Sequence, residues 1–225
     1  MNKILLLILI GFIASEESKN IIIIGDSRIH EMGYTIFGLG DTKYYSSRYY
    51  TNYYAMITPE PVSYNDYNIQ IAASQDISKL ISADYPIYSE VVSLLNNAAE
   101  GTNVLFHMGF DGNSLYNFNN IVNFIGKLAD KYPKLNFYFV SLIGVDESYT
   151  KITNSDIKDF NIKMENRIEI VEFDNLKYKS ILNEGNPTQI ILGDEVIEIL
   201  NYVSEGTGFF KKGYSKILDA LIEGF

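Results

Sequence analysis

Four consecutive isoleucines, Ile21 to Ile24, restrict the possible folds of this chain more than any other feature of its sequence. A short run of β-branched residues that ends at a glycine, here Gly25, is typical of a strand covered on both faces. Such strands lie inside parallel sheets with helices on both sides. The run therefore predicts an α/β domain.

Further apolar runs alternate with helical patterns along the chain. Helices are expected within 85–101, 114–133, 153–166 and 209–225, and strands at 69–72, 103–109, 135–144 and 167–173, the last at a sheet edge. Strands separated by helices pair in parallel through right-handed crossovers. The expected architecture is a three-layer α/β domain with about five parallel strands.

Length and charge limit the functional classes. The chain has 225 residues, 47% of them hydrophobic, which suits a single domain over residues 16–225. Its formal charge of -10 disfavours nucleic acid and anionic membrane surfaces as partners.

The first fifteen residues have the pattern of a secretory signal peptide. Lys3 supplies the positive charge, Ile4 to Ala14 form an apolar run too short to cross a bilayer, and cleavage is expected near Ser15. We expect a secreted or cell-surface protein without a stable membrane anchor. Because the chain has no cysteine, core packing must hold its fold without disulfides.

A tyrosine-rich segment, residues 34–67, interrupts the alternation of strands and helices. It contains nine of the eighteen tyrosines and is expected to be a long irregular insertion. Tyrosine offers rigid amphipathic area, which suits sugars, peptides or protein surfaces. The same segment also suits a simple cover over the sheet edge, and both interpretations stay open.

The residues Gly25-Asp26-Ser27 follow the isoleucine strand directly. Ligands of open α/β sheets bind at the carboxyl ends of the strands, and the helix that follows would present its amides to a developing negative charge. Ser27 is therefore either a nucleophile or the cap of that helix.

Three stretches resemble the SGNH (GDSL-like) hydrolases. "IIIIGDSR" is similar to the first family block, "LNFYFVSLIGVDESYTKITNSDIKDFNIKM" to a later strand and helix, and "EGTGFFKKGYSKILDALI" to the C-terminal block. The resemblance spans roughly Ile21 to Ile222 and implies a flavodoxin-like fold.

The family implies a serine hydrolase of acyl or acetyl esters on carbohydrates or lipids. Its serine attacks, a histidine takes the proton, an aspartate orients that histidine, and the serine amide, a glycine and an asparagine stabilise the oxyanion. Ser27 takes the position of the serine, flanked by Asp26 and Arg28 of the same block.

The C-terminal block departs from the family pattern. Glu205 takes the aspartate position, but Gly208 stands where the histidine belongs. A competing alignment places "NEGNPT" there, with Asn186 in the histidine position. In the first alignment, residues 183–203 form an insertion with its own short helix.

The oxyanion blocks are altered as well. Gly109 matches the family glycine of the third block, but Asp111 replaces its asparagine and Asn113 lies two residues later. In the second block, Ala73 and Ser74 stand where the glycine would be. A carboxylate aimed at an oxyanion opposes the chemistry.

Only His30 and His107 could replace the missing base. The resemblance with these losses implies a secreted binding protein that is no longer catalytic, with carbohydrate, an acylated small molecule or a protein as partner. The alternative is a serine esterase or acetylhydrolase that uses Ser27 and a displaced histidine. Neither a cofactor nor a metal is expected, since no Walker loop or zinc spacing occurs.

Overall fold

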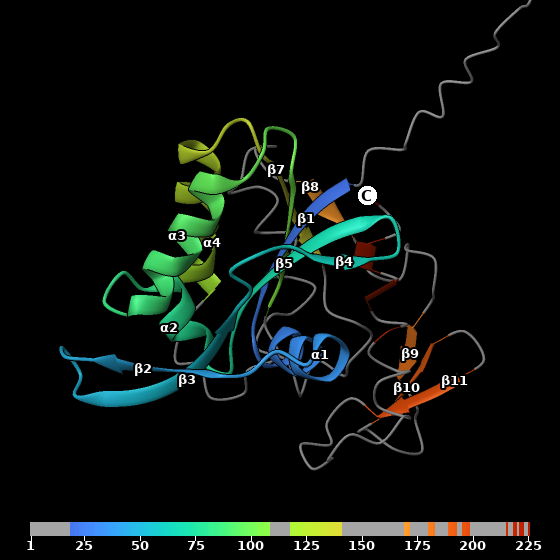
Figure 1. Cartoon of the computed structure of the whole chain (residues 1–225), viewed down its shortest axis with the longest axis horizontal. Helices are drawn as coiled ribbons and strands as arrows, with labels where there is room; N and C mark the ends of the chain where they lie inside the picture. The colour runs from blue at the N-terminus through green and yellow to red at the C-terminus, as the bar shows by residue number, and fades with distance from the viewer. Residues whose placement is uncertain are drawn as a thin grey trace, which may run out of the picture.

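The computed structural model describes residues 19–108, 118–140, 169–171, 180–182, 189–192 and 195–198, together with residues 215, 218, 219, 221, 222 and 225. Its elements (Figure 1) are β1 Lys19–Gly25, α1 Ser27–Phe37, β2 Thr42–Ser46, β3 Thr51–Ile57, β4 Val62–Tyr64, β5 Tyr67–Ser74, α2 Ile77–Ile81, α3 Pro86–Asn97, β6 Asn103–His107, α4 Phe118–Lys131, β7 Asn136–Val140, β8 Glu169–Val171, β9 Ser180–Leu182, β10 Gln189–Leu192 and β11 Glu195–Glu198.

The main sheet has the strand order β2-β3-β5-β1-β6-β7-β8, with β4 paired to β5 beside this path. The five strands from β5 to β8 are parallel to one another, and among the described strands β8 forms one edge. Numbered among themselves along the chain, they follow the order 2-1-3-4-5. The α/β class, the parallel pairing and the edge position of β8 are therefore confirmed.

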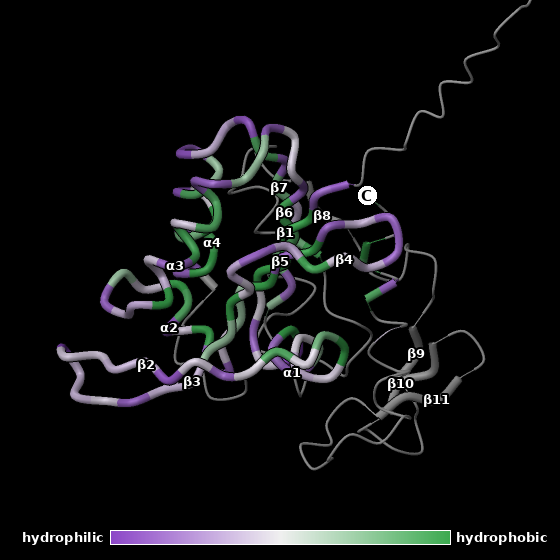
Figure 2. Tube along the Cα trace, in the orientation of Figure 1, coloured by the Kyte–Doolittle hydropathy of each residue, from purple (hydrophilic) through white to green (hydrophobic). Residues whose placement is uncertain are grey.

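The isoleucine strand is buried on both faces, as predicted. Ile22 and Ile24 pack in a core beneath α2, α3 and α4. Ile21 and Ile23 face the opposite core, which contains residues of α1 together with Leu218, Leu221 and Ile222 near the C-terminus. Figure 2 shows hydrophobic residues along the central strands and on the helices that cover them. The sheet is thus the middle of three layers.

The tyrosine-rich segment is not irregular, so that expectation is wrong. After α1 ends at the left-handed Gly38, β2 and β3 form an antiparallel hairpin with a four-residue turn at residues 47–50. β3 and β4 both pair antiparallel to β5. The segment therefore covers the outer edge of the parallel sheet, because backbone pairing satisfies groups that an irregular loop would leave open.

In the insertion expected at 183–203, the described residues form strands, and the other residues, in which the predicted short helix would have to lie, are outside the described part. Two of its segments are strands, since β10 pairs antiparallel with β11, and β9 completes a separate three-stranded sheet. Ile190 and Ile191 of β10 lie opposite Ile197 and Val196 of β11, an apolar match between the two strands of a hairpin.

Several expectations fall outside the described residues: the signal peptide at 1–15, the helix at 153–166 and the start of the helix expected within 114–133. No helix among the described residues is long and apolar enough to cross a membrane.

Candidate functional site

The turn after β1 places Ser27 at the carboxyl end of the central strand. Asp26 is the N-cap of α1, and its side chain accepts a hydrogen bond from the amide of Arg28 at 3.3 Å. Ser27 is the first helical residue and is half-buried. The interpretation of Ser27 as the helix cap is therefore wrong, because Asp26 fills that role.

Gly25 allows the turn to pass close to its neighbours. A Cβ at this position would lie 2.2 Å from Cγ1 of Ile29 and 2.5 Å from the carbonyl oxygen of His107. Only glycine lets α1 and β6 approach the strand end this closely, which fixes the height of Ser27 above the sheet.

The strands on either side of β1 bring two further predicted site residues, Ser74 and His107, to the same carboxyl end of the sheet. Gly25 is level with Ala73 on β5 and with His107 on β6. Ser74 follows Ala73, is fully buried, and its Oγ accepts a hydrogen bond from the amide of Asp76 at 3.2 Å. Its hydroxyl therefore shapes the turn before α2.

His30 is paired with a carboxylate that the sequence did not single out. Its Nε2 lies 2.6 Å from Oδ1 of Asp41, and only 5% of the imidazole side chain is exposed. Asp41 lies just before β2. The nearest sequence signal is Gly38, whose left-handed conformation ends α1 three residues before Asp41.

His107 is fully buried near the end of β6. Side chains alternate along a strand, and Leu105 packs in the core on the α1 side, so the imidazole of His107 faces the same layer. β6 is a parallel neighbour of β1, so His107 lies beside the end of that strand.

Charged side chains of α1 surround the His30–Asp41 pair. Burial raises the pKa of Glu31 above its ordinary value of 4.5, although positive charge on His30 and Arg28 acts in the opposite direction and Asp41 adds to the rise. The guanidinium group of Arg28 is itself buried, with the residue 3% exposed. The first turns of α1 thus hold both signs of charge beside Ser27.

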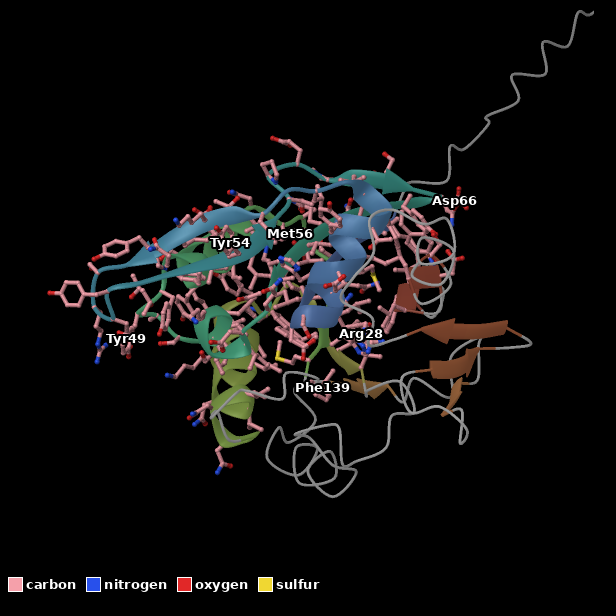
Figure 3. All side chains as sticks on the ribbon, turned by 90° about the horizontal axis from the view of Figure 1, so that it is seen from below. Arg28, Tyr49, Tyr54, Met56, Asp66 and Phe139 are labelled. Atoms are coloured by element: carbon pink, nitrogen blue, oxygen red, sulfur yellow. The ribbon has the colours of Figure 1, made fainter. Side chains whose placement is uncertain are left out.

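The β2–β3 hairpin extends past the carboxyl end of the sheet. Ala55 is level with Ser74, the last residue of β5, so Thr51 to Tyr54 and the paired part of β2 lie beyond that end. Figures 1 and 3 show the hairpin projecting from the body of the molecule, with Tyr49 near its tip. The hairpin therefore forms one wall beside the strand ends.

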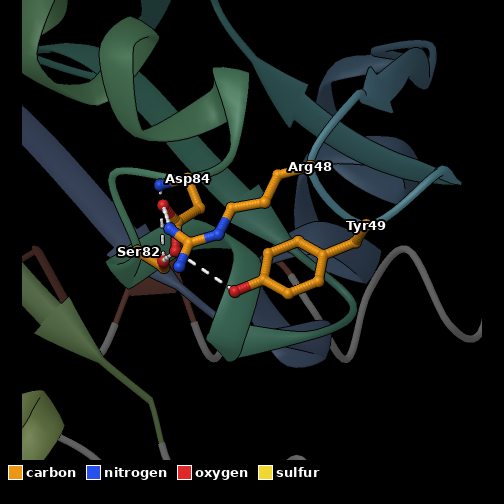
Figure 4. Close-up of polar contacts among 4 residues, drawn as sticks. All are labelled: Arg48, Tyr49, Ser82 and Asp84. Carbon is orange, nitrogen blue, oxygen red and sulfur yellow. Dashed lines mark hydrogen bonds and ion pairs between the residues drawn. The ribbon is translucent and has the colours of Figure 1, made fainter.

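Contacts with the segment between α2 and α3 and with the first turn of α3 hold this wall in place. Arg48 forms an ion pair with Asp84, and the Tyr49 hydroxyl donates to Oδ2 of Asp84 at 3.2 Å (Figure 4). The ring of Tyr49 stacks on Tyr85 with centroids 5.1 Å apart. The amide of Ile87, in the first turn of α3, donates to the Tyr53 hydroxyl at 3.2 Å.

The remaining predicted site residues, Gly109, Asp111, Asn113 and Glu205, lie outside the described residues, as do Asn186 and Gly208. Within the described segments, no group of three or more His, Cys, Asp or Glu residues has the geometry of a metal site.

No family model matches the chain, and no curated protein matches it. Among solved structures, the G domain of the T. maritima FeoB iron transporter is similar at 11% identity, covering 68% of this chain and 86% of that one. The TM-score of 0.33 is too low to establish a common fold.

Proposed function

We propose that this chain is a secreted SGNH hydrolase-like protein that binds a ligand above the carboxyl ends of β5, β1 and β6 without ordinary triad catalysis. The strand order 2-1-3-4-5 supports the flavodoxin-like arrangement. In that arrangement ligands bind between β1 and β6, because the chain continues from β1 to one side of the sheet and from β6 to the other. Ser27 stands at that point.

One observation carries the binding proposal: Ser27, Ser74 and the tyrosine-rich hairpin all lie at the carboxyl end of the parallel strands. A ligand there would meet the half-buried hydroxyl of Ser27, the amides of the first turn of α1 and a wall of tyrosines. These groups suit an acylated carbohydrate or small molecule, or a segment of a protein partner.

Two features of the chain argue against triad catalysis. The family position of the base carries Gly208, or Asn186 in the competing alignment. His30 lies on the helix of Ser27, but its Nδ1 makes no hydrogen bond to any described residue, Ser27 included. A serine without a base in hydrogen-bond reach is a weak nucleophile.

Amide chemical shifts test this proposal, with an O-acetylated oligosaccharide as the first probe and acetylated peptides as the second. We expect concentration-dependent shifts at Ser27, Arg28 and Ser74 while the acetyl groups stay on the probe. Ser27→Val should weaken binding, and Ser93→Val, on the exposed face of α3, should not. Shifts confined to residues far from the strand ends would contradict the site.

The His30–Asp41 pair favours a second candidate, a serine esterase with a displaced base. Asp41 would orient the imidazole through Nε2, and Nδ1 would face the hydroxyl one helical turn earlier. Ser27 Oγ would attack the ester carbonyl while its proton passes to Nδ1. That proton would then leave with the alcohol, and water would hydrolyse the acyl-serine with His30 again as base.

Turnover of a short-chain aryl ester separates the two candidates. The esterase predicts activity that is lost in Ser27→Ala and in His30→Gln and is reduced in Asp41→Asn. The binding protein predicts a rate equal to that of Ser27→Ala.

A further inference from the structure

The outermost strand of the main sheet, β2, has an open side. It pairs with β3 alone among the described strands, and the sheet ends there. Every second residue of an antiparallel edge strand directs its N–H and C=O away from its neighbour. β2 therefore presents a row of hydrogen-bonding groups to whatever lies beyond it.

Little in β2 discourages pairing with another chain. Its five residues pair continuously with Thr51 to Ala55, without a bulge or a proline. Lys43 is the one residue of the kind that native proteins place on edge strands to prevent association.

The open edge is held in one position before any partner arrives. The inner face of the hairpin packs Tyr44 on Tyr53, with ring centroids 5.3 Å apart, and Tyr53 meets Tyr85 edge to face. The Arg48–Asp84 ion pair fixes the turn at residues 47–50. An edge strand that is already ordered loses less conformational freedom when another strand binds to it, so binding costs less free energy.

The opposite face of the hairpin collects exposed aromatic rings. Tyr45 and Tyr54 are about half exposed, and Lys43 is the cross-strand partner of Tyr54. At the tip, Tyr50 is 82% exposed and has a left-handed φ of 52°, a conformation that is costly for a residue other than glycine. Such rings beside an open edge suit the alternate side chains of an added strand.

Charge narrows the partner. Residues 42–57 contain Lys43 and Arg48 and no acid, within a chain of net charge -10. Among the described residues, no carboxylate forms an ion pair with Lys43. A second copy paired through the same strand would bring two hairpins with only positive charges together, so an acidic segment is the better complement.

We propose that β2 captures an extended acidic polypeptide segment as an additional strand, with Lys43 attracting its carboxylates and Tyr45 and Tyr54 packing its side chains. This interaction goes beyond the ligand site at Ser27 and does not depend on it.

A synthetic probe tests the proposal: a labelled peptide of about ten residues that alternates glutamate with valine and threonine. Two counterparts accompany it, one with lysine in place of glutamate and one methylated on alternate backbone nitrogens. We expect saturable binding of the acidic peptide by fluorescence anisotropy, with slower hydrogen exchange at β2 amides. The lysine and N-methyl peptides should not bind.

Charge reversal at the edge provides the matched protein variant. Lys43→Glu should weaken binding of the acidic peptide roughly tenfold, whereas Lys127→Glu, an equal charge change on the exposed face of α4, should leave it unchanged. Ser27→Val should also leave it unchanged, which separates this edge from the proposed ligand site.

Several results would overturn the proposal. They are the absence of binding, binding that survives N-methylation, and equal binding by Lys43→Glu. Sedimentation showing a dimer that Lys43→Glu disrupts would identify a second copy as the partner instead. Shifts of Tyr45 and Tyr54 produced by an oligosaccharide, without peptide binding, would identify a sugar platform.

Discussion

Single residues at the end of β1 decide how close the first helix comes to the sheet. Gly25 has no space for a side chain, Asp26 caps α1, and Ser27 is left without a capping role at the first helical position. These assignments follow from local geometry, which is why the short motif predicted the turn correctly.

Gly25→Ala is expected to destabilise the protein by about 3 kcal/mol, because the new Cβ would overlap Ile29 and the carbonyl of His107. Urea unfolding measures the loss. Gly40→Ala is the control, since no atom lies within 4 Å of a Cβ there. Equal midpoints for the two variants would contradict the close approach.

Glu31→Gln is expected to remove a pH dependence of stability. Because burial raises the pKa of this carboxyl above 4.5, its contribution to stability is fully present below that pH and is lost as the pH rises through the folded-state pKa. Relative to the wild type, the variant should therefore gain stability between pH 4.5 and neutrality. Urea midpoints that move in parallel for both proteins would argue against the buried carboxyl.

At the scale of elements, the β2–β3 hairpin is a structure that the sequence pattern did not predict. Its tyrosines alternate between a face packed on α3 and an exposed face, yet pairs such as Tyr44-Tyr45 and Tyr53-Tyr54 hide that period because both faces carry the same residue. The segment therefore looked irregular. The contact of Asp41 with His30 was hidden for a related reason, since it depends on the path of the chain after α1.

Tyr53→Phe is expected to destabilise the protein by about 1 kcal/mol, because the amide of Ile87 in the first turn of α3 loses its acceptor. Tyr54→Phe, on the exposed face of the same strand, is the matched control and should be neutral. Chemical denaturation of the two variants decides whether the hairpin supports α3 in this way.

At the scale of the whole molecule, the parallel sheet could be predicted because each of its strands is recognisable from its own sequence, as a short apolar run between helical patterns. The antiparallel additions on the outer edge and the β9–β11 sheet could not, since their strands interrupt the alternation of strands and helices and are defined by their partners. Ser27 follows β1 and Ser74 ends β5, the neighbouring parallel strand, so the sheet order places both residues at the carboxyl ends of their strands.

Intact-mass measurement after treatment with a fluorophosphonate tests the central claim most directly, because the reagent modifies a serine only where a neighbouring base activates it. The account predicts no adduct on the wild type beyond the level of Ser27→Ala. A stoichiometric adduct mapped to Ser27, lost in Ser27→Ala and in His30→Gln, would contradict the account and establish a working hydrolase.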